Sequence, residues 1–141
     1  SALRMAPDGE GFTALTDTGD WITGRIAAAA DGAPTGLSDV TIAPIRTVDG
    51  RRTKDVGLWD SESLAIAGDM AFVGIERQHA ILAFDLKAAG GDILLARGKP
   101  LPLPDFVKAW PENRGIEALG ILPAGPYAGR LIGLAERSGE R

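Results

Sequence analysis

The sequence contains no cysteine and only one histidine, His79. The absence of thiols excludes disulfide frameworks, thiolate zinc sites and cysteine nucleophiles, and a single imidazole excludes any site that needs two histidines within this chain. A catalytic triad of Ser, His and Asp would have to use His79. We expect this histidine to lie in an exposed turn and to take no part in catalysis.

Positive charge and long apolar runs are also scarce. The 141 residues carry a formal net charge of −4, so they lack the dominant positive field with which proteins bind a phosphate backbone. No apolar run approaches the roughly 18 residues needed for a transmembrane helix. We therefore expect neither a nucleic-acid partner nor a membrane span. The 45% hydrophobic content is that of an ordinary folded domain.

What the sequence does contain is an internal repeat of about 60 residues. Each copy has a short apolar segment, a turn and a second apolar segment that ends in an acidic residue. The turns at Asp8-Gly9 and Gly68-Asp69 suit the positive φ angles of tight β connections, which indicates β-hairpins. Further strands are expected at 21–26, 40–43, 80–86 and 93–96. The copies span about 1–46, 62–98 and 117–141.

About four short strands per copy predict an all-β fold of antiparallel sheets, arranged as roughly two to three blades of a β-propeller. Segments 71–75 and 131–135 are apolar or glycine throughout, which indicates strands covered on both faces. Gly74, Gly120 and Gly133 are expected where backbones approach closely. Because propellers close with about four to eight blades, we expect the chain to be a fragment of one larger propeller domain, with exposed strand edges that favour self-association.

The remaining segments are expected to connect the strands. Residues 27–39 and 47–57 are rich in Ala, Gly, Asp and Arg and lack periodicity, which predicts long surface connections. The alternating prolines of 100–104 predict a stiff, extended stretch. A short helix is expected to begin near Asp105 and to end before Pro111.

Two pairs of sequence blocks carry a family resemblance. ESLA at 62–65 is followed by VGIER at 73–77, and NRGIEAL at 113–119 is followed by LAER at 134–137. In order and spacing these blocks resemble the phytase-like family, also called "esterase-like activity of phytase", over residues 1–137. The resemblance implies a secreted or periplasmic bacterial β-propeller, hydrolysis of esters or phosphoesters, and use of calcium. It implies no particular catalytic residues, so the catalytic set is unknown.

Carboxylates that recur in the repeat are the candidate metal ligands. Glu62 and Glu117 each precede the first strand of a copy, while Asp17, Glu76 and Glu136 end the second strands. Because equivalent positions of successive blades converge on the propeller axis, these side chains would suit Ca²⁺, which takes six to eight oxygen ligands. The alternative is that they form ion pairs and backbone hydrogen bonds between blades and hold no ligand.

Arginines of the same segments are the candidate ligand-binding residues. Arg77, Arg114 and Arg137 have the planar guanidinium that matches phosphate or carboxylate oxygens. On a regular strand Glu76 and Arg77 would point to opposite faces. The alternative is that the arginines only cover blade edges.

Two functions remain open from the sequence. The first is an extracytoplasmic, metal-assisted hydrolase of small anionic or ester substrates. The second is a non-catalytic propeller module that binds a ligand or a protein, because one fold supports many functions.

Overall fold

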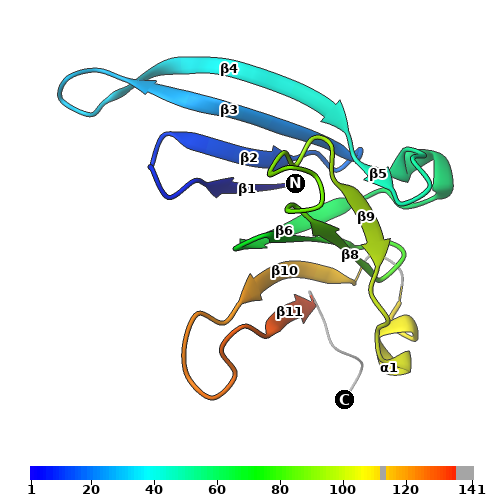
Figure 1. Ribbon diagram of the computed structural model, residues 1–141. Helices are drawn as coiled ribbons and strands as arrows, with labels where there is room; N and C mark the ends of the chain where they lie inside the picture. Colours follow the sequence, from blue (N-terminus) through cyan, green and yellow to red (C-terminus); the bar gives the residue numbers. More distant parts are fainter. Residues whose placement is uncertain (112–113, 136–141) are drawn as a thin grey trace.

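The computed structural model describes residues 1–111 and 114–135, and these residues form three sheets that lie one above the other (Figure 1). Sheet 1 has the order β1-β2-β3-β4. Sheet 2 has the order β5-β9-β8-β7-β6, and sheet 3 consists of β10 and β11. Apart from the short parallel pair β5 and β9, all neighbouring strands are antiparallel. The all-β prediction is confirmed.

Sheet 1 is a meander whose first turn follows from the Asp-Gly pair. Gly9 adopts a φ of 73°, and the Asp8 carboxylate accepts hydrogen bonds from the backbone N–H groups of Glu10 and Gly11, both at 2.9 Å. Glycine adopts this left-handed conformation without the steric cost that a side chain would add. The strands are β1 (Ala2–Met5), β2 (Gly11–Leu15), β3 (Asp20–Ala28) and β4 (Pro34–Pro44).

Sheet 2 is the central sheet and contains the most completely buried strands. Its strands are β5 (Arg46–Thr47), β6 (Ser61–Ala67), β7 (Met70–Ile75), β8 (Ala80–Asp85) and β9 (Arg97–Pro100). A 3-10 helix, Thr53–Val56, lies between β5 and β6. Within β7 the side chains of Ala71, Val73 and Ile75 have no exposed surface and belong to the larger core, while Phe72 on the other face packs against a smaller core. The expected covering of 71–75 on both faces is therefore confirmed.

Sheet 3 follows the proline-rich stretch. The short helix α1 (Asp105–Lys108) begins and ends where the prolines predicted. Strands β10 (Ile116–Ile121) and β11 (Leu131–Ala135) then form the third hairpin. No helix of the described residues is long and apolar enough to cross a membrane.

Two hydrophobic cores hold the sheets together. The larger core joins sheets 1 and 2 and includes Leu15, Trp21, Leu64 and Phe84. The smaller core joins sheets 2 and 3 and includes Ala65, Ile81, Ile116 and Leu119. Sheet 2 is therefore covered on both sides.

The hairpins are equivalent in register, as expected of propeller blades. Leu64 pairs with Val73 and Leu119 pairs with Gly133, at the same position of the two sheets. Strand β6 packs beside β10 on one side and β1 on the other, so the first strands of the blades are neighbours. The three sheets form consecutive blades of a β-propeller and do not close into a ring within the described residues.

Two strand assignments from the sequence are wrong. Residues 27–39 are not a long connection, because β3 extends to Ala28 and β4 starts at Pro34; together they form a hairpin that projects beyond the rest of sheet 1 (Figure 1). Residues 93–96 are a turn rather than a strand. Their apolar character has another cause, because Ile93 and Ala96 insert into the larger core from a loop. The strand at this place is β9, which begins at Arg97.

Expectations about coverage and close approach are only partly met. Within 47–57 the structure adds the end of β5 and a 3-10 helix to the expected connection. Strand Leu131–Ala135 is not covered on both faces, since Leu134 is 62% exposed. A Cβ on Gly74 would lie 3.3 Å from the backbone carbonyl oxygen of Ile116 in sheet 3, which confirms a close approach of backbones there. At Gly120 and Gly133 the nearest atoms would be at ordinary contact distances of 3.6 and 3.4 Å.

Candidate functional site

The candidate site lies where the first strands of sheets 2 and 3 begin. Glu62 in β6 and Glu117 in β10 each occupy an irregular position in the ladder, because the pairing shifts between Ser61 and Ser63 and between Ile116 and Ala118. Such bulges re-aim a side chain at the edge of a sheet. The two glutamates are thus equivalent residues of neighbouring blades, as the sequence predicted.

Glu76 lies in the turn after β7, and the charges of Glu62 and Glu117 affect the pKa of its carboxyl group. Burial raises the pKa of the Glu76 carboxyl above its usual value, and the charges of Glu117, Asp60 and Glu62 raise it further. A hydrogen bond from the backbone N–H of Gly115 acts in the opposite direction. Glu76 therefore holds its proton to a higher pH than an exposed glutamate does.

Gly115 fixes the start of sheet 3 against this turn. A Cβ at position 115 would lie 2.3 Å from the carbonyl oxygen of Glu76, which is closer than any side chain can pack. Only glycine lets the two backbones approach in this way. The close approach brings Glu117 of sheet 3 toward Glu76 of sheet 2.

Asp60 connects the same turn to sheet 1. Its backbone N–H donates to the Asp17 carbonyl oxygen at 2.8 Å, and its own carbonyl oxygen accepts from the Glu76 N–H at 2.9 Å. Its φ is 71°, a left-handed conformation that aspartate adopts more readily than most residues. The Asp60 carboxylate lies 3.8 Å from Arg77 Nε. Asp60 was not predicted from the sequence. The signal that could have indicated it is the position of its carboxylate two residues before Glu62.

Arg77 lies on the other side of Asp60. Its guanidinium stacks on the Trp59 ring, 4.1 Å from the ring centroid, and its buried Nε makes no hydrogen bond with any residue that the structure describes. We expected Glu76 and Arg77 to point to opposite faces of a regular strand. The structure places both residues in a turn, so this expectation does not apply. Both residues contact Asp60: Arg77 through the ion pair, and Glu76 through its backbone N–H, which donates to the Asp60 carbonyl oxygen.

A family model described as "Phytase-like: Esterase-like activity of phytase" matches residues 1–140. The chain belongs to the phytase-like family. No curated protein and no solved structure matches it.

The other predicted residues of this phytase-like chain are placed as follows. Asp17 has an exposed carboxylate and contributes its backbone carbonyl, which accepts from Asp60 and Ser61. Arg114 is half-buried and directly precedes Gly115. Glu136 and Arg137 lie outside the described residues.

The described carboxylates do not fit a resident calcium ion. Across residues 1–111 and 114–135, no group of three or more His, Cys, Asp or Glu side chains could hold a metal ion. Charges act on one another over longer distances than a metal–oxygen bond, so Glu62 and Glu117 influence Glu76 without forming a ligand set. Calcium binding stays a prediction, and no chemistry below depends on it.

His79 of the phytase-like chain differs from expectation in its burial. It lies in the turn after β7, as predicted, but is only 7% exposed. Its Nε2 is 2.9 Å from the Trp110 carbonyl oxygen, and its ring meets the Trp110 ring edge to face. This contact ties the segment before sheet 3 to sheet 2, so we assign His79 a structural role.

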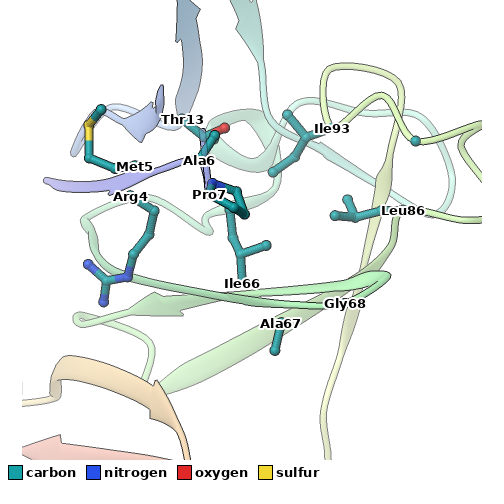
Figure 2. A pocket seen from close by; sticks show the side chains of 11 residues that line it. Arg4, Met5, Ala6, Pro7, Thr13, Ile66, Ala67, Gly68, Leu86 and Ile93 are labelled. Atoms are coloured by element: carbon teal, nitrogen blue, oxygen red, sulfur yellow. The ribbon is translucent and has the colours of Figure 1, made fainter. Parts of the chain in front are cut away.

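A separate cavity of about 460 Å³ opens between sheets 1 and 2 at the opposite end of β6. Figure 2 shows Ile66, Leu86 and Ile93 around it, with Pro7 from the turn between β1 and β2. Arg4 lies at its side, where its guanidinium donates to the carbonyl oxygens of Leu3 and Leu119 at 2.8 and 3.3 Å. None of the residues proposed from the sequence lines this cavity.

Proposed function

We propose that this chain belongs to a hydrolase of small esters or phosphoesters whose reaction centre is the turn containing Glu76. The observation that supports the proposal most directly is the raised pKa of Glu76, caused by burial and by Glu117, Asp60 and Glu62. Carboxyl groups with raised pKa values gather at catalytic sites, because a proton donor has to hold its proton until it is transferred. The family match supports the same class of reaction.

In this proposal Glu76 donates a proton to the leaving oxygen as the ester bond breaks. A water molecule forms the new bond to the carbonyl carbon or the phosphorus, and the Glu76 carboxylate takes up the proton that this water releases, which restores the acid. Arg77 orients the anionic group of the substrate, because its guanidinium is held in place by Trp59 and Asp60. A guanidinium held in this way keeps the planar fork that matches phosphate oxygens. Arg114 is the second candidate for this role.

The test compares Glu76→Gln with Asp69→Asn in an assay of p-nitrophenyl phosphate and p-nitrophenyl acetate. Asp69 is an exposed carboxylate in the β6–β7 hairpin, at the far end of the sheet from Glu76, so its removal controls for net charge. We expect Glu76→Gln to lower kcat about 100-fold or more and to abolish the alkaline limb of the pH profile, since general acid catalysis contributes about 10² to 10⁴ in rate. Equal activity of the two variants would exclude Glu76 as the acid.

The second candidate function is a non-catalytic module that binds an apolar ligand. The observation in its favour is the apolar cavity at the opposite end of β6, whose volume of about 460 Å³ is that of a small-molecule site. If neither ester is hydrolysed, with added Ca²⁺ or with a chelator, this function replaces the first.

We also propose that the protein acts in the periplasm or outside the cell. The support is the family resemblance alone. Fractionation of cells that produce the intact protein tests it: recovery only in the cytoplasmic fraction would contradict export.

A further inference from the structure

The cavity between sheets 1 and 2 has a polar wall, which sheet 1 forms. Thr13 lies two positions before Leu15 in β2, so its side chain is on the face that packs against sheet 2. Arg4 pairs with Thr13, and directly paired residues of neighbouring strands point to the same face. Both line the cavity, and Arg4 is the one charged residue among the described residues that do so. Sheet 1 therefore presents polar side chains to the gap between the sheets.

The opposite wall of the cavity is apolar and belongs to sheet 2 and its loops. Ile66 pairs with Ala71 of the larger core, so it is on the face of sheet 2 that packs against sheet 1. Leu86 follows β8, and Ile93 comes from the loop before β9. The side chains of Ile66, Leu86 and Ile93 point toward one another (Figure 2). One side of the cavity is thus continuous with the larger core.

The polar wall is a departure from the repeat. Arg4 and Ala65 each follow the leucine of a first strand, and they pair with Thr13 and Phe72 respectively. Between sheets 2 and 3, Ala65 and Phe72 pack in the smaller core and fill the interface. Between sheets 1 and 2 the same positions carry Arg4 and Thr13, and a cavity of about 460 Å³ lies beside them. The cavity therefore lies between two blades of this chain and results from polar residues at packing positions.

The charge of Arg4 has no partner of opposite sign among the carboxylates of residues 1–111 and 114–135. Its guanidinium donates only to the carbonyl oxygens of Leu3 and Leu119, which hold it in place at the side of the cavity. Arg25, on the same face of sheet 1, is by contrast paired with two carboxylates of the β1–β2 turn. A guanidinium has five N–H donors, so Arg4 can also bind an anionic group through charge-assisted hydrogen bonds.

We propose that this cavity binds a small carboxylic acid in its anionic form, with the apolar body of the ligand against Ile66 and Ile93 and its carboxylate at Arg4. An apolar pocket with a single polar anchor is typical of small-molecule sites. The proposal rests on the second candidate function, because it names the ligand class of that cavity. It does not depend on ester hydrolysis, because no residue that lines the cavity lies in the turn of Glu76.

Calorimetric titration of the chain with sodium octanoate and with octan-1-ol tests the proposal, because the two probes share an apolar chain and differ in charge. At neutral pH and low salt we expect one octanoate per chain, bound about tenfold or more tighter than octanol, since hydrogen bonds to charged groups contribute at least this factor. Arg4→Gln should lower the octanoate affinity to that of octanol and leave octanol binding unchanged. Arg25→Gln is the matched control, because it changes the net charge equally and Arg25 does not line the cavity.

Ile66→Ala tests the apolar wall. It should weaken the binding of both probes about threefold or more, because it removes apolar surface that the ligand would cover. Ile42→Ala is the control, because Ile42 is 65% exposed and pairs with Ile22 on the other face of sheet 1. An equal effect of the two substitutions would place the probes on that other face and overturn the proposal.

The two probes separate the failure of this proposal from the failure of the function on which it rests. Equal affinities of octanoate and octanol for the wild-type chain, both reduced by Ile66→Ala, would exclude the role of Arg4 and keep the cavity as an apolar site. Binding of neither probe would overturn both, and this comparison needs no variant to fold. Equal losses of octanoate affinity in Arg4→Gln and Arg25→Gln would show a general effect of charge and would also overturn the proposal.

Discussion

Trp21 of sheet 1 meets Phe84 of sheet 2 edge to face, with ring centroids 5.3 Å apart and ring planes at 75°. Both rings are completely buried in the core that joins the two sheets. Edge-to-face aromatic pairs add to the free energy gained from burial alone. This contact is therefore expected to be a principal link between the first two blades.

Replacement of Trp21 by alanine should lower the free energy of unfolding by about 3 to 5 kcal/mol, the usual cost of removing a buried aromatic ring. Urea denaturation followed by circular dichroism measures the loss. Trp59→Ala is the matched control, because Trp59 is 38% exposed and stacks on Arg77 rather than in a core. An equal loss in the two variants would show that the Trp21–Phe84 contact is not a principal link.

Gly115→Ala should destabilise the chain by about 1 to 3 kcal/mol, the range for overpacking. The added methyl group would lie 2.3 Å from the backbone oxygen of Glu76, so one of the two segments has to move. Gly120→Ala in the same sheet is the control, since its nearest neighbour would be 3.6 Å away. Thermal melts of the two variants give the comparison, and similar midpoints would contradict the close approach.

The hairpins and their equivalence could be predicted from sequence because the signal is local and repeated. Asp8-Gly9 marks its turn, and the apolar segments on either side are long enough for strands. Residues 34–39 could not be recognised as a strand, because they are exposed and are held by pairing with β3 rather than by burial. Residues 93–96 were wrongly predicted as a strand for the opposite reason. They are apolar because they belong to a loop that enters the core.

The candidate site could be predicted only in part. Glu62 and Glu117 are equivalent in register, and their charges contribute to the raised pKa of Glu76. Asp60 was missed because its role depends on a left-handed backbone and on hydrogen bonds to Asp17 and Glu76, which no sequence pattern specifies.

Glu76→Gln should stabilise the fold at neutral pH, with a gain that disappears in acid. The pKa of Glu76 is raised above the usual value of a glutamate, so the folded protein binds the proton more tightly than the unfolded chain does. Well below that usual value Glu76 is neutral in both states, and its stabilising effect is lost as the pH rises through the folded pKa. Glutamine stays neutral throughout. Urea midpoints between acid and neutral pH test this, and a gain that does not depend on pH would contradict it.

Asp60 allows a test of the junction between sheets 1 and 2, because its φ of 71° and its contact with Arg77 can be altered separately. Asp60→Ala loses the ion pair and keeps the left-handed strain, whereas Asp60→Gly loses the ion pair and relieves the strain. We expect the alanine variant to be the less stable of the two by about 1 kcal/mol. Asp60→Asn should remain close to wild type, since asparagine tolerates this conformation and a partly exposed ion pair contributes little. Urea denaturation of the three variants decides the order.

An alanine variant as stable as the glycine variant would show that the turn adopts a different backbone conformation. In that case the hydrogen bonds from Asp60 to Asp17 and from Glu76 to Asp60 would not be the link between the blades.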